Sequence, residues 1–297
     1  MMASPHFHQI MSQQRRIFDG KSGATFKNSS QDTLYVGLRT PWIMAGTPAL
    51  LDTDQSRLGD RFQRVIIEDP GQDEKRAILR SAIRSERRAM LETSNGTAGG
   101  IVDPKTRKAH ALTGGYIDWL RANVEEKLPL VESNLTDEVE DMCADLAELA
   151  ADLRARPCED KRKREVHDSK ELPTRLARQN IRLATHLCVV MNKIMVDSDV
   201  MRVVRKVALD TAHGRPLNIV RWMCSVNPKA HGALYQECGG LSEVVLSAWC
   251  NISKERLEMY LAFLKKIDVL QYRRTSQGSF WLLTDRVYDL YLRVMKG

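Results

Sequence analysis

The last eighty residues carry the pattern that most restricts the fold. Apolar residues recur there with helical spacing in two short segments, and two runs rich in β-branched and aromatic residues follow, joined by a glycine-containing turn. Ser253 and Thr284 stand where helices would begin, as N-cap residues. The pattern predicts a short helix over 241–249, a second helix from 253, strands over 269–274 and 279–283, and a final helix from 284.

The order helix, turn, helix, β-hairpin is that of a winged helix-turn-helix. The positions expected to be buried in it are Leu257, Leu261, Leu264, Phe280 and Leu282. The DNA-binding candidates are Lys254 near the start of the second helix and Arg273, Arg274 and Gln277 in the wing. The second helix of such modules enters the major groove by its N-terminal end, while basic wing residues meet phosphates.

Two acidic residues limit the affinity expected of this module. Glu255 and Glu258 share the exposed side of the second helix and would repel the DNA backbone. Binding should therefore be weak, salt-sensitive and largely independent of sequence. The alternative is that the module packs on the chain's own helical region or on a partner protein.

Charge is unevenly distributed along the chain, which has a net charge of +7. Residues 136–153 contain seven acids and no Lys or Arg. Residues 154–182 contain ten bases and five acids, and residues 216–297 contain eleven bases and seven acids. A basic C-terminal half is expected of a chain that approaches a polyanion such as DNA. An ordinary solvated face would explain the same counts.

Length and composition indicate a soluble chain of about two domains, since 297 residues are 43% apolar and contain no apolar run of the ~20 residues that a membrane span needs. The N-terminus does not have the pattern of a secretory signal, so a cytoplasmic location is expected. The six cysteines form no CxxC pair, and buried reduced thiols are the expected state. No metal site is expected.

Helical spacing dominates the middle of the chain from Asp73 onward. A polar loop or hairpin is expected around 95–115, and 159–170 is expected to be an exposed basic linker. Asp197 or Ser198 should cap a helix that ends before Gly214. Amphipathic helices are predicted over 116–128, 139–153, 173–192 and 200–208.

The first seventy residues supply few elements. A helix is predicted over 5–20, a buried strand ending at Ala45, and a second strand over 61–68. These are too few for an independent α/β domain with a covered sheet. The predicted fold is therefore mainly α with a small α/β remnant at the N-terminus.

Known catalytic motifs are incomplete in this sequence. Gly20-Lys21-Ser22 does not form a phosphate-binding loop, because the glycine required five residues before Gly20 is Arg15. The sequence contains neither HExxH nor GxSxG. No complete active site is present.

Three residues remain as candidates for contact with an anion. Arg61 opens a predicted strand and could reach a neighbouring subunit's phosphate, or pair locally with an acid. Arg175 lies in the first turn of its helix, where an anion or an exposed salt bridge with Glu171 would fit equally. Thr47 follows Gly46 at the end of a predicted strand, a position for a ligand-facing group or an ordinary turn.

Several short motifs resemble the ATPase core of helicase and primase-helicase type P-loop ATPases of phages and mobile elements, which are related to AAA+ proteins such as the minichromosome maintenance helicases. The motifs occur in the family's order and span most of the chain. They are Ile17-Phe-Asp-Gly20, Ile43-Met-Ala-Gly-Thr-Pro48, Leu58-Gly-Asp-Arg-Phe62 and Glu171-Leu-Pro-Thr-Arg-Leu-Ala177. The resemblance implies a sensor-1 turn at Thr47, an arginine finger at Arg61 and a sensor-2 arginine at Arg175.

The chain departs from that family in lacking its Walker A lysine and Walker B acids, which belong upstream of residue 1. The resemblance then implies the C-terminal part of an ATPase, from a truncated, split or remnant gene, that is not active alone. ATP and Mg²⁺ would bind only after completion by a Walker-motif-bearing partner chain; the expected partners are that chain or a homo-oligomer, and DNA, but no membrane.

The predicted organisation has three parts. Residues 1–72 form the ATPase-core remnant, 73–215 a helical lid-like region, and 216–297 the winged helix. The expected function is the sensor, lid and DNA-binding portion of an AAA+-like ATPase in mobile-element replication. The alternative is a stand-alone winged-helix regulator or adaptor that binds DNA.

Overall fold

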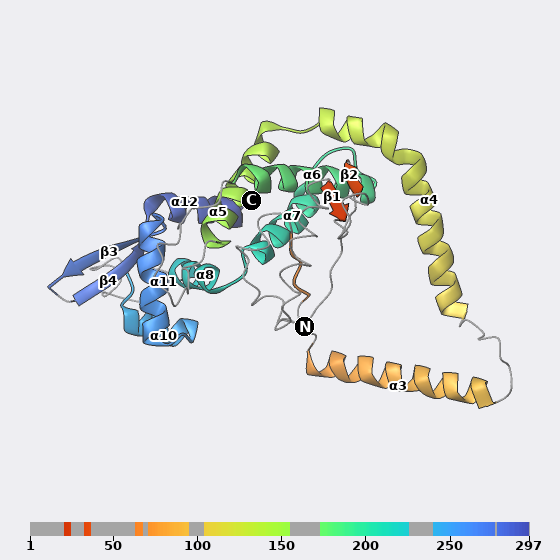
Figure 1. Ribbon diagram of the computed structural model, residues 1–297, viewed down its shortest axis with the longest axis horizontal. Coiled ribbons are helices and arrows are strands. Elements are labelled where there is room, and N and C mark those ends of the chain that lie inside the picture. Colours follow the sequence, from red (N-terminus) through yellow and green to blue (C-terminus); the bar gives the residue numbers. More distant parts are fainter. Residues whose placement is uncertain are drawn as a thin grey trace. The chain divides into compact units, whose positions relative to one another are not determined.

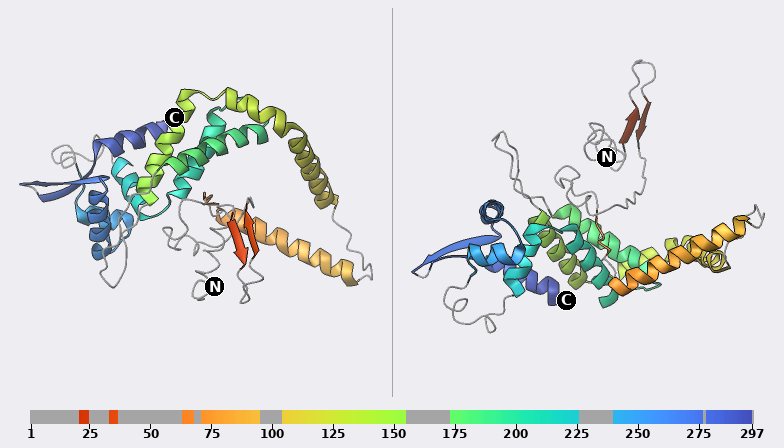
Figure 2. Two further views of the ribbon diagram at one scale, coloured as in Figure 1. Left: turned by 45° about the horizontal axis from the view of Figure 1, so that its top comes forward. Right: turned by 90° about the horizontal axis from the view of Figure 1, so that it is seen from below.

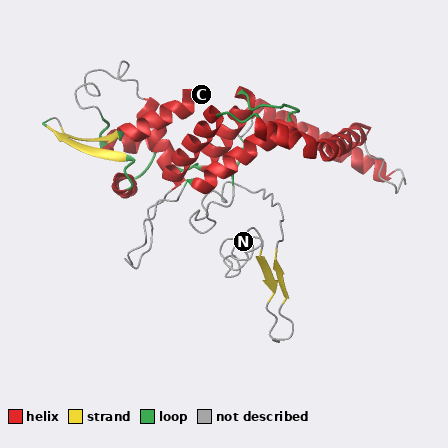
Figure 3. Cartoon of the chain, turned by 90° about the horizontal axis from the view of Figure 1, so that it is seen from above, coloured by secondary structure: helices red, strands yellow, loops and turns green. Residues whose placement is uncertain are grey.

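The computed structural model is mainly helical (Figure 3). Its described part contains nine helices and two small antiparallel sheets of two strands each. The described residues are 21–24, 33–36, 63–67, 71–94, 104–154, 173–225, 240–276 and 278–296. No helix within these ranges is both long and apolar enough to cross a lipid bilayer.

The chain divides into two compact units. The first contains residues 1–64, 136–184 and 197–297, and the second contains 65–135 and 185–196. In the first unit, β1 (Lys21–Ala24) pairs with β2 (Thr33–Val36) in an antiparallel hairpin (Figure 1). The sequence predicts a strand that ends at Ala45, downstream of β2, and it predicts no strand at β1. The predicted helix 5–20 and the strand end at Ala45 lie outside the described residues.

Helix α5 (Asp137–Arg154) is central to the packing of the first unit. It contacts α7 (Ser198–Thr211), α8 (Arg215–Ser225) and α12 (Asp285–Lys296). The amphipathic helix predicted over 139–153 is confirmed, with Leu146, Leu149 and Leu153 buried, but Ala147, Ala150 and Ala151 are buried as well. The second half of α5 is therefore covered on more than one face, because three helices pack around it.

Helix caps and polar contacts fix the neighbouring helices. Asp197 caps α7 as predicted, since its Oδ1 accepts a hydrogen bond from the Val200 backbone N–H at 3.1 Å. Helix α6 (Thr174–Val190) confirms the helix predicted from 173, and its buried Asn180 donates from Nδ2 to the Cys143 carbonyl oxygen at 3.1 Å. This bond ties α6 to α5 within the first unit.

The helices and the hairpin predicted for the C-terminal region are confirmed, but the first helix begins at Glu243 and not at Leu241, which is extended. They are α10 (Glu243–Cys250), α11 (Lys254–Lys266), β3 (Leu270–Thr275), β4 (Gly278–Leu283) and α12 (Figure 1). Asn251 has a left-handed backbone with φ +50°, which turns the chain between α10 and α11. Ser253 precedes α11 but makes no side-chain cap bond. All five positions predicted to be buried (Leu257, Leu261, Leu264, Phe280 and Leu282) are buried.

A short third extended segment joins the C-terminal hairpin. Leu241 and Trp281 form an antiparallel bridge with two backbone hydrogen bonds of 2.9 Å. Gly240 precedes this bridge, and a Cβ there would stand 2.5 Å from the Trp281 carbonyl oxygen. The close approach of the backbone to β4 therefore requires glycine at this position.

Two long helices dominate the second unit, α3 (Gln72–Ser94) and α4 (Pro104–Ser133) (Figure 2). The loop or hairpin predicted around 95–115 is wrong for 104–115, because α4 runs through Gly114 and Gly115. Each glycine costs about 1 kcal/mol relative to alanine, and the surrounding helix offsets that cost. Asn134 donates from Nδ2 to the Ile194 carbonyl oxygen at 3.1 Å, which joins the end of α4 to 185–196.

The strand predicted over 61–68 is wrong for residues 63–67, which form no strand. The Arg64 backbone N–H donates to Thr211 Oγ1 of α7 at 2.9 Å instead of to a neighbouring strand. Val65 and Ile67 are 63% and 90% exposed. The β-branched run thus finds no covered sheet face to bury it, and β propensity depends on that burial.

Candidate nucleic-acid interface

Helix α11 presents one polar side beside its buried one. Leu257, Leu261 and Leu264 are fully buried, and the residues at positions i, i+4, i+8 and i+11 from Lys254 share the exposed side. Those residues are Lys254, Glu258, Ala262 and Lys265. The helix therefore carries one lysine at each end of its exposed side, with Glu258 between them. Glu255 is exposed beside them, so both acids predicted on this side are present.

The register of the hairpin separates its two arginines. Tyr272 pairs with Trp281, Arg273 with Phe280, and Arg274 with Ser279. Because successive side chains of a strand point to opposite faces, Tyr272 and Arg274 share one face and Arg273 lies on the other. Both arginines are exposed, but they lie on opposite faces of the hairpin.

Aromatic contacts connect the Tyr272 face of the hairpin to α11 and α10. Lys265 Nζ lies 5.6 Å from the centre of the Tyr272 ring, a cation–π distance. The Tyr272 hydroxyl and Ser279 Oγ are 2.6 Å apart, and the Tyr272 and Trp281 rings meet edge to face at 5.0 Å. Trp281 Nε1 donates to Glu243 Oε1 at 3.1 Å. Lys265, Tyr272 and Arg274 thus form one exposed basic and aromatic surface, called here the wing face.

The predicted DNA-binding residues are only partly brought together. Lys254 is exposed at the start of α11 and forms an ion pair with Glu258 at 3.9 Å. Arg274 belongs to the wing face, whereas Arg273 lies on the opposite face of the hairpin. Gln277 lies outside the described residues.

Of the three predicted anion contacts, the structure describes one. Thr47 and Arg61 lie outside the described residues. Arg175 is exposed in the first turn of α6, as the sequence predicts. The backbone N–H groups of a first helical turn have no partner within the helix, which makes the position suitable for an anion.

Sequence reasoning missed Lys265 and Tyr272. A signal for each is present: Lys265 stands eleven residues after Lys254, on the same side of the helix, and Tyr272 stands two residues before Arg274 on the same strand face. What the sequence does not contain is the crossing of α11 and β3, which brings the lysine over the ring.

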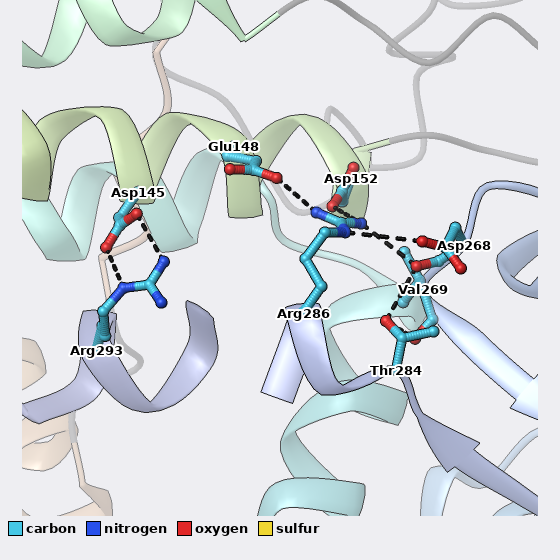
Figure 4. Close-up of polar contacts among 8 residues, drawn as sticks. All are labelled: Asp145, Glu148, Asp152, Asp268, Val269, Thr284, Arg286 and Arg293. Atoms are coloured by element: carbon cyan, nitrogen blue, oxygen red, sulfur yellow. Dashed lines mark hydrogen bonds and ion pairs between the residues drawn. The ribbon is translucent and has the colours of Figure 1, made fainter. Parts of the chain in front are cut away.

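A second cluster of charges, which we call the α5–α12 clasp, joins α12 to α5 (Figure 4). Arg286 donates to Glu148 Oε1 at 2.6 Å and to Asp152 Oδ2 at 2.9 Å. Arg293 donates to both carboxylate oxygens of Asp145, at 2.7 and 3.0 Å. The acids at i, i+3 and i+7 of α5 therefore face two arginines at i and i+7 of α12.

The clasp holds its arginines in the charged form. Partial burial works to lower the pKa of Arg286, but hydrogen bonds and charges from Asp152 and Glu148 outweigh it and raise the pKa. The hydrogen bond from Arg293 to Asp145 raises the pKa of Arg293 in the same way. The clasp gives a structural role to three of the acids in the segment 136–153, which pair with arginines of α12 in the same chain.

Among the described residues, packing within the chain is observed for α12. Helix α12 packs on α5, whereas Lys265, Tyr272 and Arg274 remain exposed. The C-terminal region is thus held to α5 through α12, while its wing face is exposed to solvent.

Three of the four described cysteines are poor nucleophiles. Burial raises the pKa of Cys143 and Cys224 to about 12 and that of Cys250 to about 11, so their thiols stay protonated at neutral pH. Within the described ranges, no group of His, Cys, Asp and Glu is placed to hold a metal ion.

Comparison of the chain with models of protein families, with curated proteins and with solved structures finds no match.

Proposed function

We propose that residues 215–296 form a winged helix that binds duplex DNA, with the exposed side of α11 in the major groove and the wing face against the phosphate backbone. The bridge between Leu241 and Trp281 is the observation that carries this proposal. It adds a third extended segment, so that the order becomes helix α8, strand, helices α10 and α11, and hairpin β3–β4. That order and the exposed second helix are typical of winged DNA-binding modules.

The cations of the wing face and of the start of α11 have different expected contacts on DNA. Lys265 and Arg274 are suited to phosphates, because both are exposed cations on one surface. Lys254 stands at the end of α11 that would enter the groove, where Glu258 competes for its charge. The module should therefore bind DNA with little sequence preference and with a strong dependence on salt.

The test compares two arginines that neighbour each other in sequence but lie on opposite faces. Arg274→Gln in the full chain should flatten the slope of log affinity against log salt by about one unit, because one phosphate contact is lost. Arg273→Gln is the matched control and should change the slope less. Titration of a labelled duplex at several salt concentrations measures both. Equal slopes in both variants and the unaltered chain would contradict the proposed wing face.

We further propose, as a second function, that the chain completes a P-loop ATPase whose Walker motifs are supplied by another fragment. Arg175 in the first turn of α6 supports this, because it is exposed beside the N-terminal end of the helix, where a nucleotide phosphate could be bound. The stand-alone DNA-binding regulator needs no such fragment.

Complementation distinguishes these two roles. The chain alone should not hydrolyse ATP, and addition of a fragment with Walker A and Walker B motifs should restore hydrolysis. Arg61→Ala should then reduce the rate on the order of 10³-fold if Arg61 acts as a finger, and Arg175→Ala should also reduce it. Absence of hydrolysis with every such fragment, together with DNA binding by the chain alone, would favour the regulator.

A further inference from the structure

Helix α3 carries a row of arginines outside the C-terminal region. It is an uninterrupted helix of 23 residues (Figure 2). Arg76, Arg80, Arg84 and Arg87 follow each other at intervals of four, four and three residues, and all four side chains are exposed. At 100° and 1.5 Å per residue, they lie within about 80° of arc and extend over about 16 Å of the helix axis. We call them the arginine row.

The arginine row is not neutralised within the described part of the chain, where none of its four members forms an ion pair or hydrogen bond. The α5–α12 clasp shows the contrast, because both of its arginines donate to carboxylates. Like charges four residues apart destabilise a helix by about 0.2–0.5 kcal/mol per pair. A row of such pairs is a cost that a bound polyanion would remove.

The chemistry of α3 favours duplex DNA over a membrane surface. Ile78, Leu79 and Ile83 are 54%, 62% and 67% exposed, which is the start of an apolar face. Glu86 falls in the same arc, seven residues after Leu79 and three after Ile83, so insertion of this face into lipid would bury a carboxylate.

The composition of α3 disfavours binding to a single-stranded nucleic acid. Single-stranded nucleic acids are held by aromatic side chains on which bases stack, and α3 contains no aromatic residue. Each guanidinium of the arginine row offers two parallel N–H donors that match phosphate oxygens. A duplex presents its phosphates on the outside, so they can be bound without unstacking any bases.

We propose that the arginine row of α3 binds the phosphate backbone of duplex DNA. This second DNA-binding surface goes beyond the winged-helix function, because it lies on a different helix in the other compact unit. Contact with phosphates alone reads no base edges, so the surface adds affinity without sequence preference.

The test replaces the four arginines by glutamine in the full chain (R76Q, R80Q, R84Q and R87Q). Glutamine has a helix propensity close to that of arginine, so circular dichroism should be unchanged. The slope of log affinity against log salt for a labelled duplex should flatten by about 3.6 units. The loss of affinity between about 50 and 200 mM salt would then be about a hundredfold smaller in the variant.

A rearranged variant of equal charge is the control. Exchange of neighbours (R80S with S81R, and R84S with S85R) keeps composition and net charge but breaks the row. It should flatten the slope by about two units, and an unchanged slope in this variant would overturn the assignment to a row. Unaltered duplex binding by the glutamine variant, with loss of its binding to phosphatidylcholine–phosphatidylserine vesicles, would overturn the proposal in favour of a membrane surface.

The outcome is independent of the proposed winged helix. Arg274→Gln and the four glutamine substitutions lie on separate helices and strands, so each slope change can occur without the other. A flattened slope in the α3 variant alone would support the arginine row and contradict the wing face.

Discussion

At the scale of single residues, Asp152 is a buried carboxylate that is paired with Arg286. Its side chain is fully buried in α5, and Arg286 donates to its Oδ2 at 2.9 Å. A buried carboxylate needs hydrogen bonds and an opposite charge to offset the loss of its hydration. Arg286 is one third exposed, so water screens part of its charge, and its contribution is smaller than that of a fully buried pair.

Arg286→Ala should therefore lower the free energy of unfolding by about 1–3 kcal/mol. Arg293→Ala is the matched control on the same helix, because its guanidinium is more exposed and should contribute less than about 1 kcal/mol. Urea unfolding of both variants measures the difference. In Arg286→Ala combined with Asp152→Asn, the second change should restore part of the loss; equal losses for Arg286→Ala and Arg293→Ala would contradict this account.

At the scale of elements, periodicity predicted the helices and strands that bury one face. Leu257, Leu261 and Leu264 of α11 and Val287, Leu290 and Val294 of α12 are buried at helical spacing. Such patterns depend on local packing, and the sequence contains them in full. The same reasoning gave the hairpin β3–β4 from its turn and its β-branched and aromatic residues.

The predictions of secondary structure are wrong or incomplete where glycine or proline is taken to end a helix, and where a predicted strand has no neighbouring strand to pair with. Gly114 and Gly115 indicated a loop, yet α4 continues through them. The helix end predicted before Gly214 is confirmed, because α7 ends at Thr211. Helix α8, which begins at Arg215 directly afterwards, is not predicted, although Pro216 is well suited to a first helical turn. Residues 63–67 have strand composition but bond to α7.

The candidate site was predictable in composition but not in arrangement. Lys254 and Arg274 are predicted from their positions on a helix and a hairpin, and both are exposed. The wing face depends on how α11 crosses β3, and the α5–α12 clasp joins residues more than 130 positions apart. Contacts at such separation are set by tertiary packing, which a single sequence does not state.

At the scale of the whole molecule, the clasp makes the C-terminal region depend on a segment far upstream. Helix α12 follows the hairpin in sequence, but it packs on α5, whose residues precede α8 by about sixty positions. A fragment that starts at Arg215 contains every element of the proposed winged helix and lacks α5. It therefore loses the acids that hold Arg286 and Arg293, together with one of the surfaces against which α12 packs.

Hydrogen exchange on such a fragment should show which contacts hold α12. In residues 215–297 alone, amides of α12 should exchange at least tenfold faster than in the full chain, because the helix opens locally once α5 is absent. Amides of β4 should keep most of their protection, since they bond to β3 and to Leu241 within the fragment. Equal protection of α12 in both proteins would mean that the C-terminal region holds this helix by itself. Faster exchange in β4 as well would mean that the proposed winged helix needs α5 to fold, and DNA-binding measurements would then require the full chain.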